Sequence, residues 1–77
     1  MNITCIQTIK SNDGTFIFSK KKNYDVHARV GQLIIIKDDL GCMHEIAREK
    51  EGKIVLGKQF KDVFSITVEN VQELINI

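Results

Sequence analysis

Residues 24–47 read YDVHARVGQLIIIKDDLGCMHEIA, and this stretch decides the fold class. In its first seven residues apolar side chains alternate with polar ones, which is typical of a half-buried strand. Gly31 ends that segment, and a second strand is expected over residues 32–37. Residues 38–41 predict a turn and residues 42–47 a return strand, because the Asp-Asp-Leu-Gly sequence favours tight backbone turns. Three strands joined by short turns indicate an antiparallel meander.

The rest of the chain extends this pattern. Alternating or apolar segments predict further strands over residues 2–9, 15–18, 53–57 and 64–68. Polar connections separate them: a turn at 11–14, a lysine-rich loop at 19–23, a charged hairpin loop at 48–52 and an irregular connection at 57–62. The fold expected is mainly β, a small antiparallel barrel of five to six strands.

A short C-terminal helix is expected to follow the last strand. Val71, Leu74 and Ile75 have helical spacing, Thr67 is placed to cap the helix, and Glu69 is acidic in its first turn. The strand over residues 33–36 is apolar on both faces, and a helix of this kind is a candidate to cover one of them.

Composition narrows the classes of function. The chain has 77 residues and is expected to form a single domain over 1–77, with little volume for an internal substrate cleft. Its 11 basic and 10 acidic residues leave a net charge of +1, whereas dedicated nucleic-acid binders are usually more basic. The two cysteines do not suggest a disulfide framework, and no apolar run approaches a membrane span. We therefore expect a cytoplasmic protein that does not insert into membranes.

Three segments carry a resemblance to a known family. They are the lysine-rich stretch leading into a Tyr-x-Val strand (18–26), the strand, Asp-Asp-x-Gly turn and return strand (35–46), and the closing Phe-x-x-Val-Phe element (60–64). Together, over roughly residues 16–66, they resemble the small SH3-like barrel proteins of bacteriophages and prophages of Gram-positive bacteria. The resemblance implies an accessory protein that binds a component of the bacterial host, and it brings no catalytic residue with it.

An apolar patch is the first candidate contact surface. Ile34 and Ile36 lie opposite the strand face assigned to the core, as do Ile6, Ile17 and Val55. If they stay exposed they form a patch of the kind that marks protein contacts. The alternative is that a tightly curved barrel and its helix bury all of them.

A basic cluster is the second candidate. Lys20, Lys21 and Lys22, with Tyr24 and Arg29 nearby, could contact phosphates while the aromatic ring stacks on a base. The alternative is a solvated loop whose lysines prevent unwanted strand pairing, with Tyr24 in the core.

The remaining polar residues do not form a recognisable reactive site. Cys5, Cys42, His27 and His44 lack the paired spacing of zinc ligands, so no metal site is predicted. Cys42 and His44 have no third orienting group, and the Asp38-Asp39 pair is better read as turn chemistry than as a cation site. We expect no enzyme activity and no cofactor.

The leading hypothesis is a non-enzymatic binding module that modulates a host bacterial protein by steric blocking, with a homodimer left open. One alternative is a nucleic-acid-binding barrel that uses Lys20, Lys21, Lys22 and Arg29 together with surface lysines such as Lys58 and Lys61. Another is an oligomer that sequesters a nucleotide signal at its interface.

Overall fold

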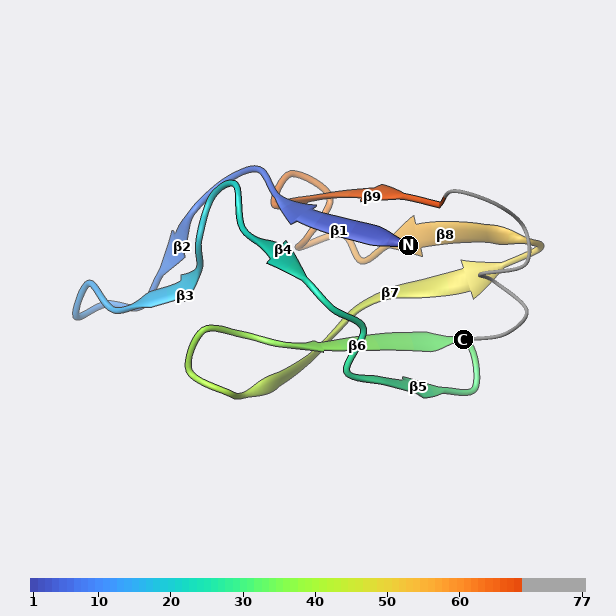
Figure 1. The fold of residues 1–77 in the computed structure, drawn as a ribbon, viewed down its shortest axis with the longest axis horizontal. Coiled ribbons are helices and arrows are strands. Elements are labelled where there is room, and N and C mark those ends of the chain that lie inside the picture. The colour runs from blue at the N-terminus through green and yellow to red at the C-terminus, as the bar shows by residue number, and fades with distance from the viewer. Residues whose placement is uncertain (69–77) are drawn as a thin grey trace.

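The fold of the described part of the chain, residues 1–68 of a computed structural model, consists entirely of strands, turns and loops. The strands are β1 (Asn2–Cys5), β2 (Ile9–Lys10), β3 (Phe16–Phe18), β4 (Asn23–Tyr24), β5 (Ala28–Val30), β6 (Leu33–Lys37), β7 (Met43–Lys50), β8 (Lys53–Leu56) and β9 (Phe64–Thr67). All pairings are antiparallel, which confirms a mainly β fold with antiparallel sheets. Figure 1 shows the β2–β3 hairpin extending to one side of the other strands.

A four-stranded meander in the order β5-β6-β7-β8 forms the largest sheet. Its turns follow the predicted chemistry. Gly31 and Gly41 both have positive φ, at 59° and 86°. Glu51 and Gly52 have φ values of 53° and 76°, as in the hairpin turn that matches strand twist. The meander predicted from residues 24–47 is therefore confirmed from residue 28 onward, and β7 continues to Lys50 rather than ending at Ala47.

The second sheet joins distant parts of the sequence in the order β4-β1-β9. In it Ile3 pairs with both Tyr24 and Ile66. The small β2–β3 hairpin is separate from both larger sheets. It contacts the meander through the backbone, because the Asp39 amide donates to the carbonyl of Ile17 at 2.8 Å.

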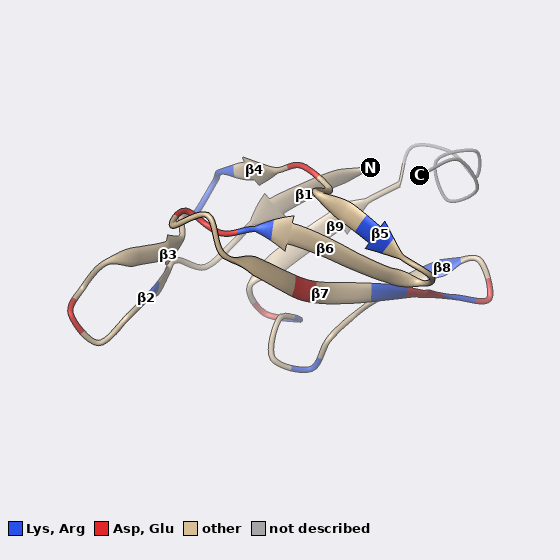
Figure 2. Ribbon diagram, turned by 90° about the horizontal axis from the view of Figure 1, so that it is seen from below, with Lys and Arg blue, Asp and Glu red and all other residues tan. Residues whose placement is uncertain are grey.

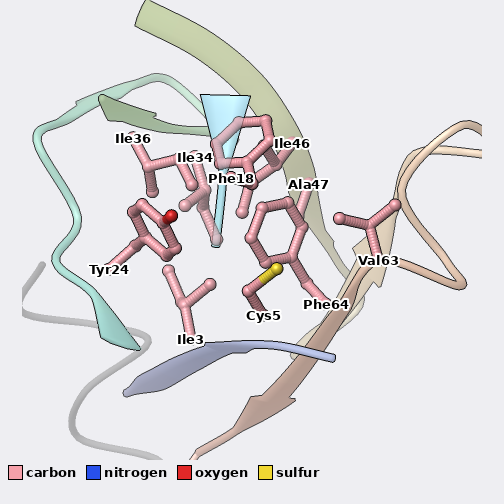
Figure 3. Packing of buried hydrophobic residues seen from close by; sticks show 10 residues of the cluster. All are labelled: Ile3, Cys5, Phe18, Tyr24, Ile34, Ile36, Ile46, Ala47, Val63 and Phe64. Carbon is pink, nitrogen blue, oxygen red and sulfur yellow. The ribbon is translucent and has the colours of Figure 1, made fainter. Parts of the chain in front are cut away.

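The core lies between the three sheets (Figure 3). Its buried side chains come from six strands and the connection before β9: Ile3, Cys5, Phe18, Tyr24, Ile34, Ile36, Ile46, Ala47, Val63 and Phe64. Phe18 packs edge-to-face against Tyr24 and Phe64, with ring centroids 5.4 and 4.9 Å apart. Such aromatic pairs add about 0.5–1.5 kcal/mol each beyond the burial of their surface.

Several expectations need correction. Residues 24–30 are not one strand, because Tyr24 belongs to β4 of one sheet and Ala28 begins β5 of another. Residues 2–9 are likewise interrupted between β1 and β2. The strands form three sheets whose hydrogen bonding does not close into a barrel over residues 1–68. Thr67 is the last residue of β9, and the helix expected around Val71, Leu74 and Ile75 lies outside the described residues.

Candidate functional site

The solvent-facing side of the four-stranded sheet is the best-developed surface for a partner, and we call it the outer face. Its members follow from the register, because residues directly opposite each other across strands share a face. Val30, Leu33, Arg48 and Val55 form one row across all four strands. Ala28, Ile35 and Glu45 form the next row, and Lys37 pairs with Met43 in a third.

Apolar side chains stand unusually far out of the core on the outer face. Val30, Met43 and Val55 are 59%, 62% and 46% exposed, and Leu33 and Ile35 are half-buried. An exposed Val or Met alone is ordinary, but here several share one sheet face, as residues at contact sites do. Val30 and Leu33 are neighbours on β5 and β6, whereas Arg48 of β7 stands between Leu33 and Val55.

Charged side chains lie between and beside these apolar residues, and most are basic. Lys37, Arg48, Lys50 and Lys53 are exposed and lie on the same side of the sheet, together with one acidic residue, Glu45. Arg48 and Glu45 are 3.9 Å apart, Nη2 to Oε1, in an exposed pair that contributes little to stability. These mostly basic side chains therefore favour a partner surface that carries acidic side chains.

A small recess lies beside the row that ends at Val55. It has a volume of about 90 Å³ and is lined by residues 45–48 of β7 and 55–57 at the end of β8. A register shift between β6 and β7 lies at the same place and turns both Ile46 and Ala47 toward the core. The recess has room for one small apolar side chain of a partner.

Two of the residues considered for the apolar patch are not available for it. Ile34 and Ile36 are fully buried, which is the alternative that the sequence left open, so they do not form a partner-binding surface. Their neighbours Leu33 and Ile35 take the outward positions instead. Lys37 could have indicated from the sequence which face of β6 is exposed. It follows Ile35 by two positions and so lies on the same face, and a charged residue marks that face as the solvated one. Of the other patch residues, Ile6 and Val55 are exposed and Ile17 is half-buried.

The basic cluster is only partly assembled. Lys20, Lys21 and Lys22 are exposed in a turn that pairs with β1, where the Lys21 amide donates to the Cys5 carbonyl at 2.8 Å. Tyr24 is buried in the core and presents no ring for stacking. Arg29 lies on the inner side of β5 and forms an ion pair with Glu49, so its charge is already partnered.

The turn before β7 holds a polar cluster that the sequence pattern indicated only in part. Asp38 accepts hydrogen bonds from the backbone amides of Leu40 and Cys42 at 2.9 and 2.8 Å, the expected turn chemistry. It is also 2.7 Å from Nε2 of His44. Burial raises the pKa of Asp38, but the contacts with His44 and the two amides outweigh it and hold the pKa below its usual value.

Asp39 connects this turn to the second sheet. Its Oδ1 accepts from the Tyr24 hydroxyl at 2.8 Å and from Lys22 Nζ at 2.7 Å, and its Oδ2 accepts from the Ser19 hydroxyl at 2.6 Å. Burial acts to raise the pKa of Asp39, but these three contacts lower it below its usual range. Burial also raises the pKa of Tyr24 to about 12, so its hydroxyl stays a donor to Asp39. Sequence reasoning missed this role of Asp39, since its partners are 15 to 20 residues away.

The four nominal metal ligands are dispersed. Cys5 is buried, and Cys42 is exposed at the turn before β7. Burial raises the pKa of the Cys5 thiol, whose Sγ donates to the Gln7 carbonyl. Among residues 1–68 no three His, Cys, Asp or Glu side chains gather in a way that could hold a metal ion. The same residues include no helix long and apolar enough to cross a membrane.

Comparisons of the chain with protein-family models, with curated proteins and with solved structures find no match.

Proposed function

We propose that the protein is a non-enzymatic binding module that docks on another protein through the outer face of its four-stranded sheet. The observation that carries the proposal is the combination of Val30, Met43 and Val55, all largely exposed, on one face where the charges between and beside them are predominantly basic. Protein interfaces combine apolar contact area with polar and charged side chains. The partner surface that complements this face carries apolar and acidic side chains.

The resemblance of residues 16–66 to SH3-like phage and prophage proteins supports a finer form of the proposal. In that form the chain is a divergent SH3-like domain, and the partner is a protein of the bacterial host that is inhibited by steric blocking. The residues with reactive side chains are consistent with this, because Asp38 and His44 bond to each other and organise a turn.

The charge of the outer face favours a different protein over a second copy of this chain as the occupant. A two-fold dimer through this face would bring two predominantly basic surfaces, each with Lys37, Arg48 and Lys53, against each other. Like charges brought together at an interface oppose association. An acidic partner would instead satisfy each of them.

The test is a binding comparison between matched variants. Immobilised wild-type chain is exposed to a bacterial lysate with and without nuclease, and a protein retained after digestion is identified by mass spectrometry and purified. Its affinity is then measured for wild type, for Val55→Glu and for Ile6→Glu. Both positions are exposed to a similar extent, 46% and 47%, but only Val55 lies on the outer face.

The proposal expects Val55→Glu to weaken binding by tenfold or more, about 1.4 kcal/mol, and Ile6→Glu to leave it unchanged. Equal effects of the two substitutions would place the contact elsewhere. Recovery of nucleic acid, with its proteins lost on digestion, would instead favour the lysine-rich turn as the functional element.

A further inference from the structure

The β2–β3 hairpin is a second surface element, separate from the outer face. It belongs to neither of the two larger sheets, and Figure 1 shows it extending beyond the other strands along the long axis of the molecule. Figure 2 shows the same projection in a view turned by 90°, with an acidic segment, drawn red, in the turn of the hairpin. The described part of the chain therefore carries a narrow projection at one end.

The base of this projection is fixed to the rest of the fold. Phe18, at the end of β3, is buried in the core. The carbonyl of Ile17 accepts a hydrogen bond from the amide of Asp39 at 2.8 Å. The hydroxyl of Thr8 accepts one from the amide of Lys20 at 3.0 Å. A two-stranded hairpin is only marginally stable by itself, so these contacts hold it and set its direction.

The turn of the hairpin is ordered by its own hydrogen bonds. Asp13 accepts from the hydroxyl of Ser11 and, at 3.0 Å, from the amide of Thr15. The bond from Ser11, followed by those from Thr15, lowers the pKa of Asp13 to about 2, so its carboxylate is charged at neutral pH. Because the turn is ordered in the free chain, a contact made through it loses little conformational entropy.

Phe16 presents an aromatic ring close to this turn. It is 46% exposed, although Phe18, two positions later on the same strand, is only 2% exposed. On the facing strand, Nζ of Lys10 lies 4.7 Å from the centre of the Phe16 ring. Aromatic side chains are enriched at the centres of protein interfaces, where they supply a large contact area at low entropic cost. The hairpin thus carries an exposed side chain of the type that anchors protein contacts.

The chemistry of the projection narrows the class of its partner. The charged carboxylate of Asp13 opposes entry of the turn into a lipid bilayer and contact with nucleic-acid phosphates. A second copy of the chain is a poor host, because the recess beside Val55, about 90 Å³, has room only for a small side chain. An apolar cleft in a different protein can receive the ring of Phe16 while polar groups at its margin contact Lys10 and Asp13.

We infer that the β2–β3 hairpin inserts into an apolar cleft of another protein, with Phe16 as the side chain that enters it. Lys10 and Asp13 contact polar groups at the margin of the cleft. The contact makes no use of Val55 and the outer face, so its loss and the loss of binding at the outer face are measured separately.

The first test is photo-crosslinking from a defined position of the full chain. The photoreactive analogue p-benzoylphenylalanine replaces Phe16 in one variant and Ser65, an exposed residue of β9, in a control. Each variant is irradiated in a nuclease-treated bacterial lysate. We expect position 16 to give an adduct with a protein that an excess of unmodified chain suppresses, and position 65 to give none. Absence of this adduct, or a crosslink from position 16 to a second copy of the chain, would overturn the inference.

The second test measures the affinity of the purified crosslinked protein for three variants. Phe16→Ser is expected to weaken binding by tenfold or more, because the ring supplies the apolar contact. Asn12→Trp enlarges an exposed side chain in the turn and is expected to have a similar effect, because the wider turn no longer enters the cleft. Val55→Glu is expected to leave this affinity unchanged.

Amide NMR signals of residues 8–18 are compared with those of the wild type to verify that each hairpin variant keeps its hairpin. Wild-type affinity in either hairpin variant would overturn the inference. An equal loss of affinity from Val55→Glu would assign the captured protein to the outer face, and would also overturn it.

Discussion

The two faces of β6 present the same residue types to different surroundings. Ile34 and Ile36 point inward and are completely buried, whereas Leu33 and Ile35 point outward and are only half-buried. On the inner side of the sheet the charged side chains of Arg29 and Glu49 form an ion pair with each other. On the outer side the charges are exposed and mostly basic. The same strand thus contributes to the stability of the fold on one face and to a contact surface on the other.

The difference shows that apolar character alone does not identify the core. A small chain buries only a limited part of its surface, so a strand that is apolar on both faces has one face left over. Which face is left over depends on where the other sheet packs. The predictions below test this contrast, from the largest expected effect to the smallest.

The largest contrast is expected between Ile36→Ala and Leu33→Ala. The first leaves a cavity among fully buried side chains and is expected to lower the free energy of unfolding by about 2–5 kcal/mol. The second removes a half-buried side chain and is expected to cost about 1 kcal/mol. Urea denaturation of both variants measures the difference. Similar losses at the two positions would contradict the assignment of the faces.

The two ion pairs of the sheet provide a second contrast. Glu49 partners Arg29, whose side chain is only 11% exposed, so Glu49→Gln leaves a nearly buried charge without its counter-ion. We expect a loss of about 1–3 kcal/mol in unfolding free energy. The matched change on the outer face, Glu45→Gln, removes an exposed pair and is expected to cost less than about 0.5 kcal/mol. A double variant, Arg29→Met with Glu49→Leu, should recover part of the loss.

Lowering the pH is expected to weaken the hydrogen bonds and ion pairs of Asp38 and Asp39 in the turn before β7. The contribution of the outer face to stability is expected to stay the same. Because the pKa values of Asp38 and Asp39 are lowered in the folded state, their stabilising effect is present above the unfolded value of about 4. It is lost as pH falls through the folded pKa, since the unfolded chain then binds more protons.

Urea midpoints at pH 7, 5 and 3 measure this loss. At pH values below 4 the urea midpoint of the wild type is expected to decrease, because each of the two carboxylates loses a stabilising contribution of about 1 kcal/mol. Asp39→Asn should be less stable at pH 7 and change less on acidification, while Glu45→Gln should follow wild type. An unchanged pH dependence in Asp39→Asn would show that Asp39 is not stabilised as described.

The smallest effect on stability is expected at the exposed positions of the outer face. Met43→Glu and Val55→Glu should change the free energy of unfolding by less than about 0.5 kcal/mol, because both side chains already stand in solvent. Val55→Glu is nevertheless expected to weaken partner binding. Thermal unfolding of each variant, measured beside the binding assay, separates loss of contact from loss of fold. A large decrease in the free energy of unfolding of either variant would mean that the outer face is not exposed to solvent.

The sequence predicted the strands and turns well where the signals are local. The meander and the turn at residues 38–41 follow from alternation and from turn residues such as Gly41, which accepts positive φ. The hairpin loop predicted over residues 48–52 is present but shorter, because β7 extends to Lys50 and leaves only Glu51 and Gly52 in the turn. It failed where a segment changes sheets. Residues 24–30 alternate like one strand, but the chain bends between Tyr24 and Ala28, and nothing in the alternation marks that bend.

Of the five residues considered for an apolar patch, Val55 is exposed on the outer face, whereas Ile34 and Ile36 are buried. The outward positions of β6 belong to Leu33 and Ile35. Alternation specifies that two sets of side chains face opposite ways, and it does not say which set faces inward. Arg29 was assigned to a basic cluster because it follows the lysines in sequence, whereas Glu49, its partner, is 20 residues away.

By itself, the sequence determined a mainly β chain, its antiparallel meander and the turns that connect it, because these depend on neighbouring residues and backbone conformation. Only the tertiary structure decided which face of β6 is core, that the strands separate into three sheets, and that Asp39 joins Lys22, Tyr24 and Ser19. Those features arise from packing between segments far apart in the chain. Local pattern does not encode such contacts, since each depends on where several distant elements come to lie.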